Sequence, residues 1–202
     1  MLYVGHYLPM TEVLGPGKRF ALWLQGCERR CPGCINPAGW SLTTGGTMYS
    51  VEHLADIICD AAPALTGITI SGGEPMLQHE PLGRLLDLLA ERTALDVILY
   101  TGYTLEEVYT LLSGQADTFL NKIDILIDGS YIEQENHNEM LRGSANQKMY
   151  FFTEKYRRFA QQLETAKNRS IEFHGLSDGE MWMAGIPPKD FEETLYRTLS
   201  ER

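Results

Sequence analysis

The middle of the chain repeats one pattern: a short apolar run, a turn that contains glycine, and a segment with helical periodicity. The apolar runs are 67–71, 96–100 and 123–129. Four leucines after the first run recur at the spacing of one helical face: Leu82, Leu85, Leu86 and Leu89. Strand, turn and helix in this order indicate parallel strands joined by right-handed crossovers, with ligands bound beyond the carboxyl ends of the strands. We therefore predict an α/β fold with mostly parallel strands.

Capping residues mark where two of the helices begin. Ser50 is a good N-cap for a helix that stops before Pro63, and Thr104 followed three residues later by Glu107 predicts a capping box. Alternating patterns and chain breakers predict the remaining elements. These are strands at 2–8, 20–24 and 149–152, a polar connection at 131–147, a charged helical segment to Asn168, a hairpin at 170–184 with its turn at 177–180, and a terminal helix from Lys189.

Length and charge limit the classes of function. A chain of 202 residues with 44% hydrophobic residues can build one well-buried core, so we expect a single domain over 1–202. The formal net charge of −10 argues against nucleic acid as a partner, because phosphate binding requires a basic surface. The chain shows no signal-like opening and no apolar run of about 20 residues, so we expect a cytoplasmic protein without membrane contact.

Three of the four cysteines, Cys27, Cys31 and Cys34, share the loop after the second predicted strand. In a reducing compartment, clustered thiols are more often metal ligands or redox groups than disulfides. A [4Fe–4S] cluster normally takes four thiolates, so three local ligands would leave one iron open to an exogenous ligand. A zinc site, which is usually closed by four ligands, and a redox dithiol at Cys31 and Cys34 are the alternatives. Cys59 falls within the predicted helix after Ser50, where we expect a buried core thiol rather than a ligand.

The spacing Cys-x-x-x-Cys-x-x-Cys, followed further along by a strand that ends in Gly72-Gly73-Glu74-Pro75, resembles the radical S-adenosylmethionine enzymes. Within that superfamily, additional short motifs resemble the activating proteins of anaerobic ribonucleotide reductases. These motifs are Gly15-Pro16-Gly17 with Arg19, Pro32-Gly33, Thr101-Gly102-Tyr103, Asp128-Gly129 and Arg142-Gly143-Ser144 with Asn146 and Gln147. The resemblance covers residues 15–150, and the region after Ser170 matches the pattern less clearly.

The resemblance implies a radical S-adenosylmethionine core, a partial (β/α) barrel followed by a small C-terminal hairpin and helix. It implies an oxidoreductase with one [4Fe–4S] cluster, held by Cys27, Cys31 and Cys34, because one spare thiol is too few for a second cluster. S-adenosylmethionine on the open iron would be cleaved reductively to methionine and a 5′-deoxyadenosyl radical. The residues expected to bind this cofactor are Gly72, Gly73, Glu74, Pro75, Asn36, Thr101 and Asp128.

Each of these assignments has a structural alternative. The glycines allow close backbone approach and Glu74 can accept from an amino group, but the same turn could be an ordinary connection between strand and helix. Asp128 could contact ribose hydroxyls or a cationic site, or it could form an N-cap or an Asx turn with Gly129. Trp40 could shield the cluster or simply pack. The polar group of Arg142, Asn146 and Gln147 could meet a substrate or form structural hydrogen bonds.

The resemblance also implies the partners. The expected substrate is a larger glycyl radical enzyme, from which hydrogen would be abstracted at a glycine, and the expected electron donor is a reduced flavodoxin or ferredoxin. Two competing hypotheses are a radical enzyme that modifies a peptide or small molecule, and a non-enzymatic iron–sulfur or zinc-binding protein.

Overall fold

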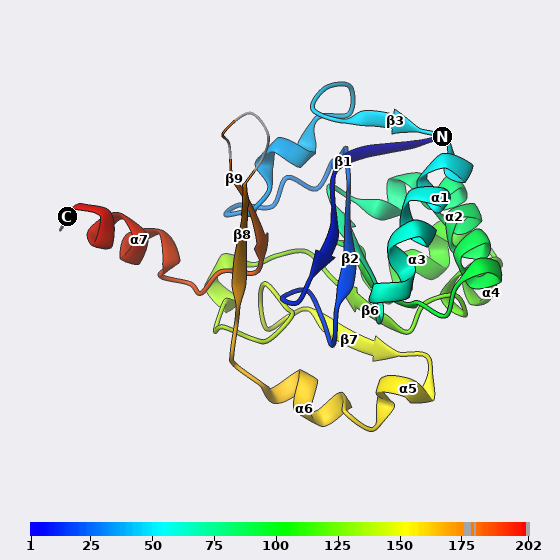
Figure 1. Ribbon diagram of the computed structural model, residues 1–202. Coiled ribbons are helices and arrows are strands. Elements are labelled where there is room, and N and C mark those ends of the chain that lie inside the picture. The colour runs from blue at the N-terminus through cyan, green and yellow to red at the C-terminus, as the bar shows by residue number, and fades with distance from the viewer. Residues whose placement is uncertain (176–178, 180, 201–202) are drawn as a thin grey trace.

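The fold is centred on a seven-stranded sheet with the strand order β3-β1-β2-β4-β5-β6-β7 (Figure 1). The structure is a computed structural model that describes residues 1–175, 179 and 181–200. The strands are β1 (Leu2–Thr11), β2 (Arg19–Leu24), β3 (Thr47–Tyr49), β4 (Gly67–Gly72), β5 (Asp96–Tyr100), β6 (Ile125–Asp128) and β7 (Lys148–Phe151). Strands β2, β4, β5 and β6 run parallel, whereas β1, β3 and β7 pair antiparallel with their neighbours. The predicted α/β class and parallel centre are confirmed; among the described residues the sheet stays open between β3 and β7, so it is not a closed barrel.

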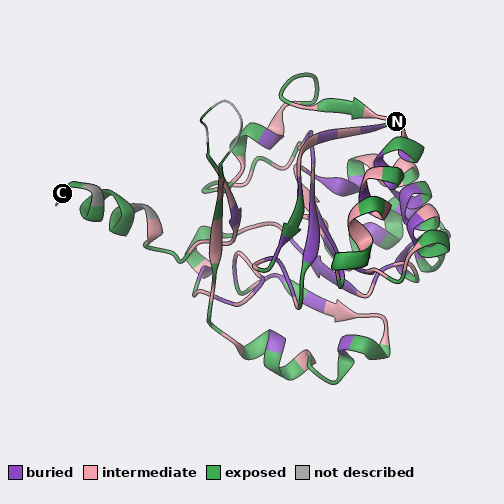
Figure 2. Cartoon of the chain, viewed as in Figure 1, coloured by how far each residue is buried: buried purple, intermediate pink, exposed green. Residues whose placement is uncertain are grey.

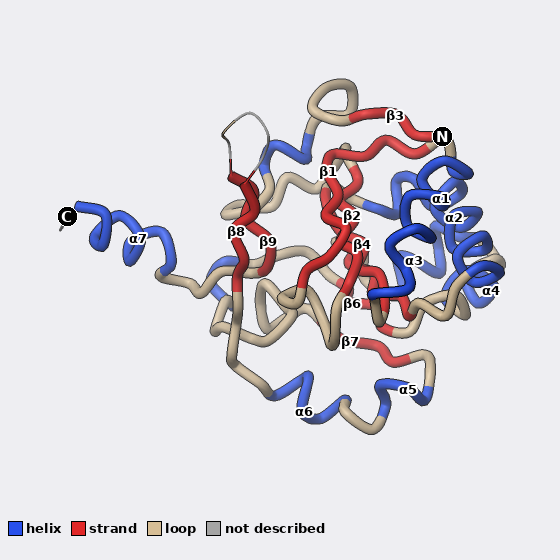
Figure 3. Tube along the Cα trace, viewed as in Figure 1, coloured by secondary structure: helices blue, strands red, loops and turns tan. Residues whose placement is uncertain are grey.

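Four helices cover one face of this sheet (Figure 3). They are α1 (Val51–Ala61), α2 (His79–Arg92), α3 (Leu105–Leu112) and α4 (Ala116–Leu120). The predicted leucine stripe of α2 is buried and packs with Leu22, Ile70 and Leu99 of the sheet in the main core. Buried segments gather in the central strands and in the helices beside them (Figure 2). The main hydrophobic core therefore lies between the sheet and this helical layer.

Both predicted helix caps are confirmed. The Ser50 hydroxyl accepts from the His53 N–H at 3.1 Å at the start of α1. At α3, the Thr104 hydroxyl accepts from the Glu107 N–H and the Glu107 carboxylate accepts from the Thr104 N–H at 2.7 Å. These bonds satisfy backbone donors that have no partner within the helix, so the sequence signals are sufficient to place both helix starts.

The other face of the sheet is covered by the later part of the chain. These elements are α5 (Glu154–Arg157), α6 (Ala160–Thr165) and the antiparallel hairpin β8 (Ile171–Gly175) with β9 (Met181–Gly185). One cluster joins Ile98, Ile125 and Ile127 to this layer, and a second joins Ala21 of β2 to Ala184 of β9. Helix α7 (Phe191–Ser200) follows the hairpin and extends away from the body (Figure 1).

The structure departs from the sequence predictions at several short elements. Helix α4 was not predicted, and the charged segment before Asn168 forms two short helices rather than one. Four 3-10 turns also lacked a sequence signal: η1 (Pro37–Trp40), η2 (Ala62–Ala64), η3 (Pro75–Gln78) and η4 (Glu133–Glu135). The predicted hairpin strands are confirmed, whereas Ser177, Asp178 and Glu180 of its predicted turn lie outside the described residues. Within the described part of the chain, no helix is long and apolar enough to cross a membrane.

A buried ion pair fixes the amino end of the parallel strands. Arg19 opens β2 and Asp96 opens β5, and their side chains approach to 2.7 Å with almost no solvent exposure. Arg19 also donates to the Thr69 hydroxyl, and Asp96 accepts from the Tyr156 hydroxyl at 2.8 Å. Buried charges require such pairing, and here the pair joins three strands to α5 at the end of the sheet away from the cysteine loop.

Candidate metal centre

The cysteine loop begins where β2 ends, beside the turn that ends β4. Leu24 pairs with Gly72 in the parallel register. The Gly73 N–H donates to the Leu24 carbonyl at 2.7 Å, and the Glu74 N–H donates to the Gly26 carbonyl at 2.8 Å. The two motifs that the sequence places far apart are therefore joined by backbone hydrogen bonds at the carboxyl ends of the parallel strands.

Two glycines make this close seating possible. Gly72 has φ +114°, a conformation that residues with a Cβ rarely adopt. A Cβ on Gly73 would collide with the Gly26 carbonyl oxygen and would lie 2.7 Å from the Gly39 carbonyl oxygen. These glycines thus allow the turn after β4 to lie directly against the cysteine loop.

Asn36 precedes η1 and Trp40 is its last residue, directly after the cysteine loop. The Gly39 carbonyl accepts from the Gly26 N–H at 2.9 Å, and the Trp40 carbonyl accepts from the Cys27 N–H at 3.2 Å. The Asn36 amide packs against Gly39 and makes no capping bond to η1. Both predicted residues therefore lie beside the cysteine loop. Trp40 is bonded through its carbonyl to Cys27, at the start of that loop.

Cys27, Cys31 and Cys34 are all free thiols of intermediate exposure. Cys27 lines a cavity of about 660 Å³ together with Glu28, Arg30 and the segment 40–43. Burial raises the pKa of the Cys27 thiol, and the negative charges of Glu74 and Cys31 act in the same direction. A bound cation would reverse this effect, because it stabilises the thiolates.

The three thiols fit an iron–sulfur cluster better than a single ion. In the described residues, no three side chains of His, Cys, Asp or Glu converge as the ligands of one metal ion do. A cluster does not require its ligands to converge on one point, because each thiolate binds a different iron atom. Three partly exposed sulfur donors in one loop beside a cavity are a suitable donor set for a cluster, and the chain offers no arrangement of this kind for a closed zinc site in its described part.

Glu74 points into the protein rather than into open space. Its carboxylate accepts from the Met76 N–H at 2.9 Å, the Thr101 hydroxyl at 2.7 Å and the Gly102 N–H at 2.7 Å. Burial raises the pKa of Glu74, although these three hydrogen bonds oppose the shift. Pro75, which follows, is buried at the start of η3 and redirects the chain into the helical layer. Glu74 thus ties the turn after β4 to the turn after β5.

Thr101 and Asp128 lie at the ends of the next two parallel strands, and both are buried. The Thr101 hydroxyl donates to Glu74, as described. The Asp128 carboxylate accepts from the Leu105 N–H at 2.7 Å and from the Lys148 N–H at 3.1 Å. It therefore caps the first N–H of α3 and holds the start of β7.

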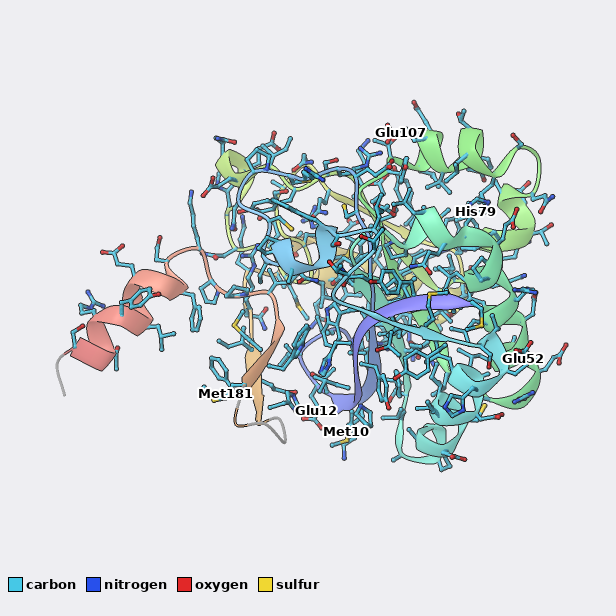
Figure 4. All side chains as sticks on the ribbon, turned by 90° about the horizontal axis from the view of Figure 1, so that it is seen from above. Met10, Glu12, Glu52, His79, Glu107 and Met181 are labelled. Carbon is cyan, nitrogen blue, oxygen red and sulfur yellow. The ribbon has the colours of Figure 1, made fainter. Side chains whose placement is uncertain are left out.

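Arg29 is a site residue that the sequence analysis did not identify. Its guanidinium stacks 4.1 Å from the centre of the Tyr103 ring and donates to the Ser130 hydroxyl at 3.0 Å and to Glu107 at 2.9 Å (Figure 4 labels Glu107 on α3). The same arginine lines a cavity of about 480 Å³ with Asp128 and other residues at the ends of β5 and β6. Its position between Cys27 and Cys31 could have marked it as a site residue. Its contacts could not be foreseen, because they are with residues distant in sequence.

The remaining candidates have structural roles. The Gln147 side chain donates to the Gly129 carbonyl, Arg142 donates to the Gln147 carbonyl, and the Asn146 amide donates to the Ser130 carbonyl. These residues thus make structural hydrogen bonds, and Asn146 also lines the cavity of about 480 Å³. Cys59 is partly rather than fully buried, and it packs against the main core from α1.

Comparisons with known proteins agree with this geometry. The family model of the 4Fe–4S single cluster domain matches residues 13–150. The anaerobic ribonucleoside-triphosphate reductase-activating protein of Vibrio cholerae serotype O1 is 38% identical over 155 residues, which cover 73% of this chain and 96% of that protein. Proteins of the same name from Enterobacteria phage T4 and from Escherichia coli K12 are each 31% identical; the matches cover 72% and 70% of this chain and 92% and 93% of those proteins.

Proposed function

Because the chain belongs to the family of anaerobic ribonucleoside-triphosphate reductase-activating proteins, we propose that it is a radical S-adenosylmethionine enzyme that generates a glycyl radical on a partner enzyme. The observation that carries this proposal is the backbone seating of the cysteine loop on the Gly72-Gly73-Glu74-Pro75 turn. When bound, the [4Fe–4S] cluster and S-adenosylmethionine would supply the chemistry, a reductive cleavage to methionine and a 5′-deoxyadenosyl radical that abstracts hydrogen from a glycine.

Cys27, Cys31 and Cys34 would hold the cluster through three of its irons. Cys59 lies in α1 within the helical layer, so the described chain supplies no fourth thiol in the loop. The remaining iron would then be open to the amino and carboxylate groups of S-adenosylmethionine. The loop is held at its start by the Cys27 N–H bond to Trp40 and by the Gly26 bonds to η1 and to the turn after β4, which position the first thiolate.

The cofactor would lie along the turns after β4, β5 and β6. We propose contacts with Gly72, Gly73, Glu74 and Pro75, with Asn36 beside the loop, and with Thr101 and Asp128 at the neighbouring strand ends. Glu74 and Thr101 are hydrogen-bonded to each other. Their proposed role is to hold the main chain of the two turns in the orientation that contacts the cofactor. The cavity of about 480 Å³ at the ends of β5 and β6 is suitable for the nucleoside.

The wider assignment includes the partners and the form of the sheet. We propose that the open sheet is a partial (β/α) barrel and that residues 1–202 form one domain.

The proposed partner is an anaerobic ribonucleotide reductase or a related glycyl radical enzyme, with a reduced flavodoxin or ferredoxin as electron donor. The names of the relatives support the first of these partners.

Anaerobic reconstitution with iron and sulfide tests the activity. With dithionite, the reconstituted protein should convert S-adenosylmethionine into 5′-deoxyadenosine and methionine. Addition of the anaerobic ribonucleoside-triphosphate reductase from the same genome should then produce a glycyl radical that is visible by electron paramagnetic resonance. A protein that binds a cluster but forms no 5′-deoxyadenosine would contradict the proposal.

A further inference from the structure

The β8–β9 hairpin lies outside the region that defines the family. The family model ends at residue 150, and the relatives match over 92–96% of their own length without covering more than 73% of this chain. The hairpin therefore lies beyond the family model, and about a quarter of this chain stays unmatched in these relatives. A segment additional to the shared core is a reasonable place for a function specific to this chain.

One face of the hairpin is docked on the sheet. The Trp182 ring lies 4.1 Å from that of His6, tilted by 30°, and 5.5 Å from that of Trp23, measured between ring centres. The Glu172 carboxylate accepts from the Thr11 hydroxyl at 2.7 Å and from the Glu12 N–H at 3.0 Å. Ahead of β8, Arg169 donates to the carbonyls of Glu139, Arg142, Gly143 and Pro187, which anchors the base of the hairpin.

These contacts also set the direction in which the hairpin points. Glu172 meets Thr11, whose partner in the sheet is Arg19 at the start of β2. Trp182 meets Trp23 at the other end of β2, next to Leu24 and the cysteine loop. The strands of the hairpin therefore run along β2, and Met181 lies at the end nearest the proposed cluster.

The opposite face of the hairpin is apolar. Residues that pair directly across an antiparallel hairpin share a face. Phe173 pairs with Met183 and Ile171 pairs with Gly185, so the outer face consists of Ile171, Phe173, Met181 and Met183. Phe173 is 50% exposed and Met181 is 71% exposed (Figure 4 labels Met181), and Phe191 of α7 approaches Phe173 at 6.3 Å. A hairpin that only covered the sheet would be expected to carry polar residues on this side.

The position of the hairpin bears on which partner would meet this face. A glycine that reacts must come to the carboxyl ends of the parallel strands, where the cysteine loop lies. Helices α1 to α4 cover one side of the sheet, and the hairpin lies on the other side (Figure 1). An enzyme that approaches the site over the second side meets the outer face of the hairpin, and methionines adapt readily to a partner surface.

We propose that the outer face of the β8–β9 hairpin, formed by Ile171, Phe173, Met181 and Met183, docks an apolar patch of the glycyl radical enzyme. This inference rests on the proposed function and adds a surface for the partner, close to the site but separate from the chemistry. The apolar contact buries two exposed side chains, which stabilises the complex without contacting the cofactor.

The double variant Phe173→Ser and Met181→Ser tests this surface. The control replaces two exposed apolar residues elsewhere, Met48→Ser on β3 (53% exposed) and Leu111→Ser on α3 (38% exposed). Binding to the anaerobic ribonucleoside-triphosphate reductase from the same genome is measured by biolayer interferometry, and 5′-deoxyadenosine formation is measured without that partner. The hairpin variant should weaken binding at least tenfold and lower the glycyl radical yield at limiting enzyme, while 5′-deoxyadenosine formation stays within twofold of wild type.

Two measurements separate the possible outcomes. Unchanged affinity in the hairpin variant, or an equal loss in the control, would overturn the inference. A change limited to self-association in sedimentation experiments would assign the face to a second copy of the chain and would also overturn it. If the wild-type protein forms no 5′-deoxyadenosine, the proposed function fails, whereas the affinity comparison still tests the docking surface.

Discussion

At the scale of single residues, backbone hydrogen bonds fix the start of the cysteine loop. The N–H of Cys27 and both backbone groups of Gly26 are bonded to η1 and to the turn after β4. The three thiols are left free, with intermediate exposure, and face no competing protein ligand set among the described residues. The loop therefore has an anchored start and available sulfur atoms, as a cluster site requires.

The four cysteines should respond differently to substitution. Replacing Cys27, Cys31 or Cys34 with Ala should abolish 5′-deoxyadenosine formation, because each removes a ligand of the proposed cluster. Cys59→Ala should retain activity and cost about 1 kcal/mol or less of stability, since this thiol is only partly buried in α1. Iron content and the spectrum of the reduced cluster provide the measurement. An equal loss in all four variants would refute the assignment of ligands.

Gly73 should be essential for seating the loop. Gly73→Ala would push a methyl group into the Gly26 and Gly39 carbonyl oxygens, at a cost of about 1–3 kcal/mol in local strain. We expect a large drop in iron and sulfide bound per protein after reconstitution. Gly83→Ala in α2 is the matched control, because its added Cβ would meet Phe119 at an ordinary 3.5 Å. Normal cluster loading in the Gly73 variant would show that the close seating is dispensable.

At the scale of elements, sequence signals located the regular parts of the fold and missed the short ones. The caps at Ser50 and Thr104, the α2 leucine stripe and the β5 boundaries follow from local chemistry, and the structure confirms them. Helix α4 has five residues, too few for a periodic pattern to be recognised. The hairpin strands were predictable, but their docking on β1 was not, because it depends on contacts such as that between Trp182 and His6.

The docking of the hairpin should depend on the charge of Glu172. Partial burial raises the pKa of Glu172, but the hydrogen bonds from Thr11, the Glu12 N–H and His174, with the charge of His174, together lower it more, so the folded pKa lies below its ordinary value of 4.5. The charged carboxylate therefore contributes to docking above about pH 4.5, and this contribution is lost as the pH falls through the lowered pKa. Glu172→Gln should weaken docking by about 1 kcal/mol at neutral pH and reduce its acid sensitivity.

Hydrogen exchange of the β8 and β9 amides measures this effect. Protection in the wild-type protein should decrease on acidification, after correction for the intrinsic exchange rate, and Glu172→Gln should start lower and change less. Glu91→Gln, at an exposed position of α2, serves as the control and should leave the hairpin amides unchanged. Identical protection in wild type and the Glu172 variant would exclude this carboxylate as an anchor.

At the scale of the whole molecule, the two ends of the sheet have different tasks. The carboxyl ends carry the turns and the cysteine loop. The amino ends carry the buried pair of Arg19 and Asp96, which Tyr156 joins from α5. The buried pair and the proposed chemistry thus lie at opposite ends of the strands, so we expect that each can be changed with little effect on the other.

Asp96→Asn should destabilise the fold without emptying the cluster site. Removing one charge of a buried pair leaves Arg19 without its counter-ion, at a cost of about 3–5 kcal/mol in the free energy of unfolding. Asp56→Asn breaks an exposed pair with Arg92 and should cost about 1 kcal/mol or less. Urea unfolding measures both values. Iron bound per folded protein should stay at the wild-type level in the Asp96 variant, and a selective loss of iron would contradict the separation.

The sequence by itself determined the parallel α/β centre, the helix starts and the three thiols of the loop, because these follow from periodicity, caps and spacing over short stretches. Only the tertiary structure decided that Glu74 turns inward, that Arg29 reaches Ser130 and that the hairpin covers β1 and β2. Glu74 meets a backbone group 28 positions away, and Arg29 meets a side chain 101 positions away. Such contacts arise when the sheet brings the strand ends together, so no local pattern encodes them.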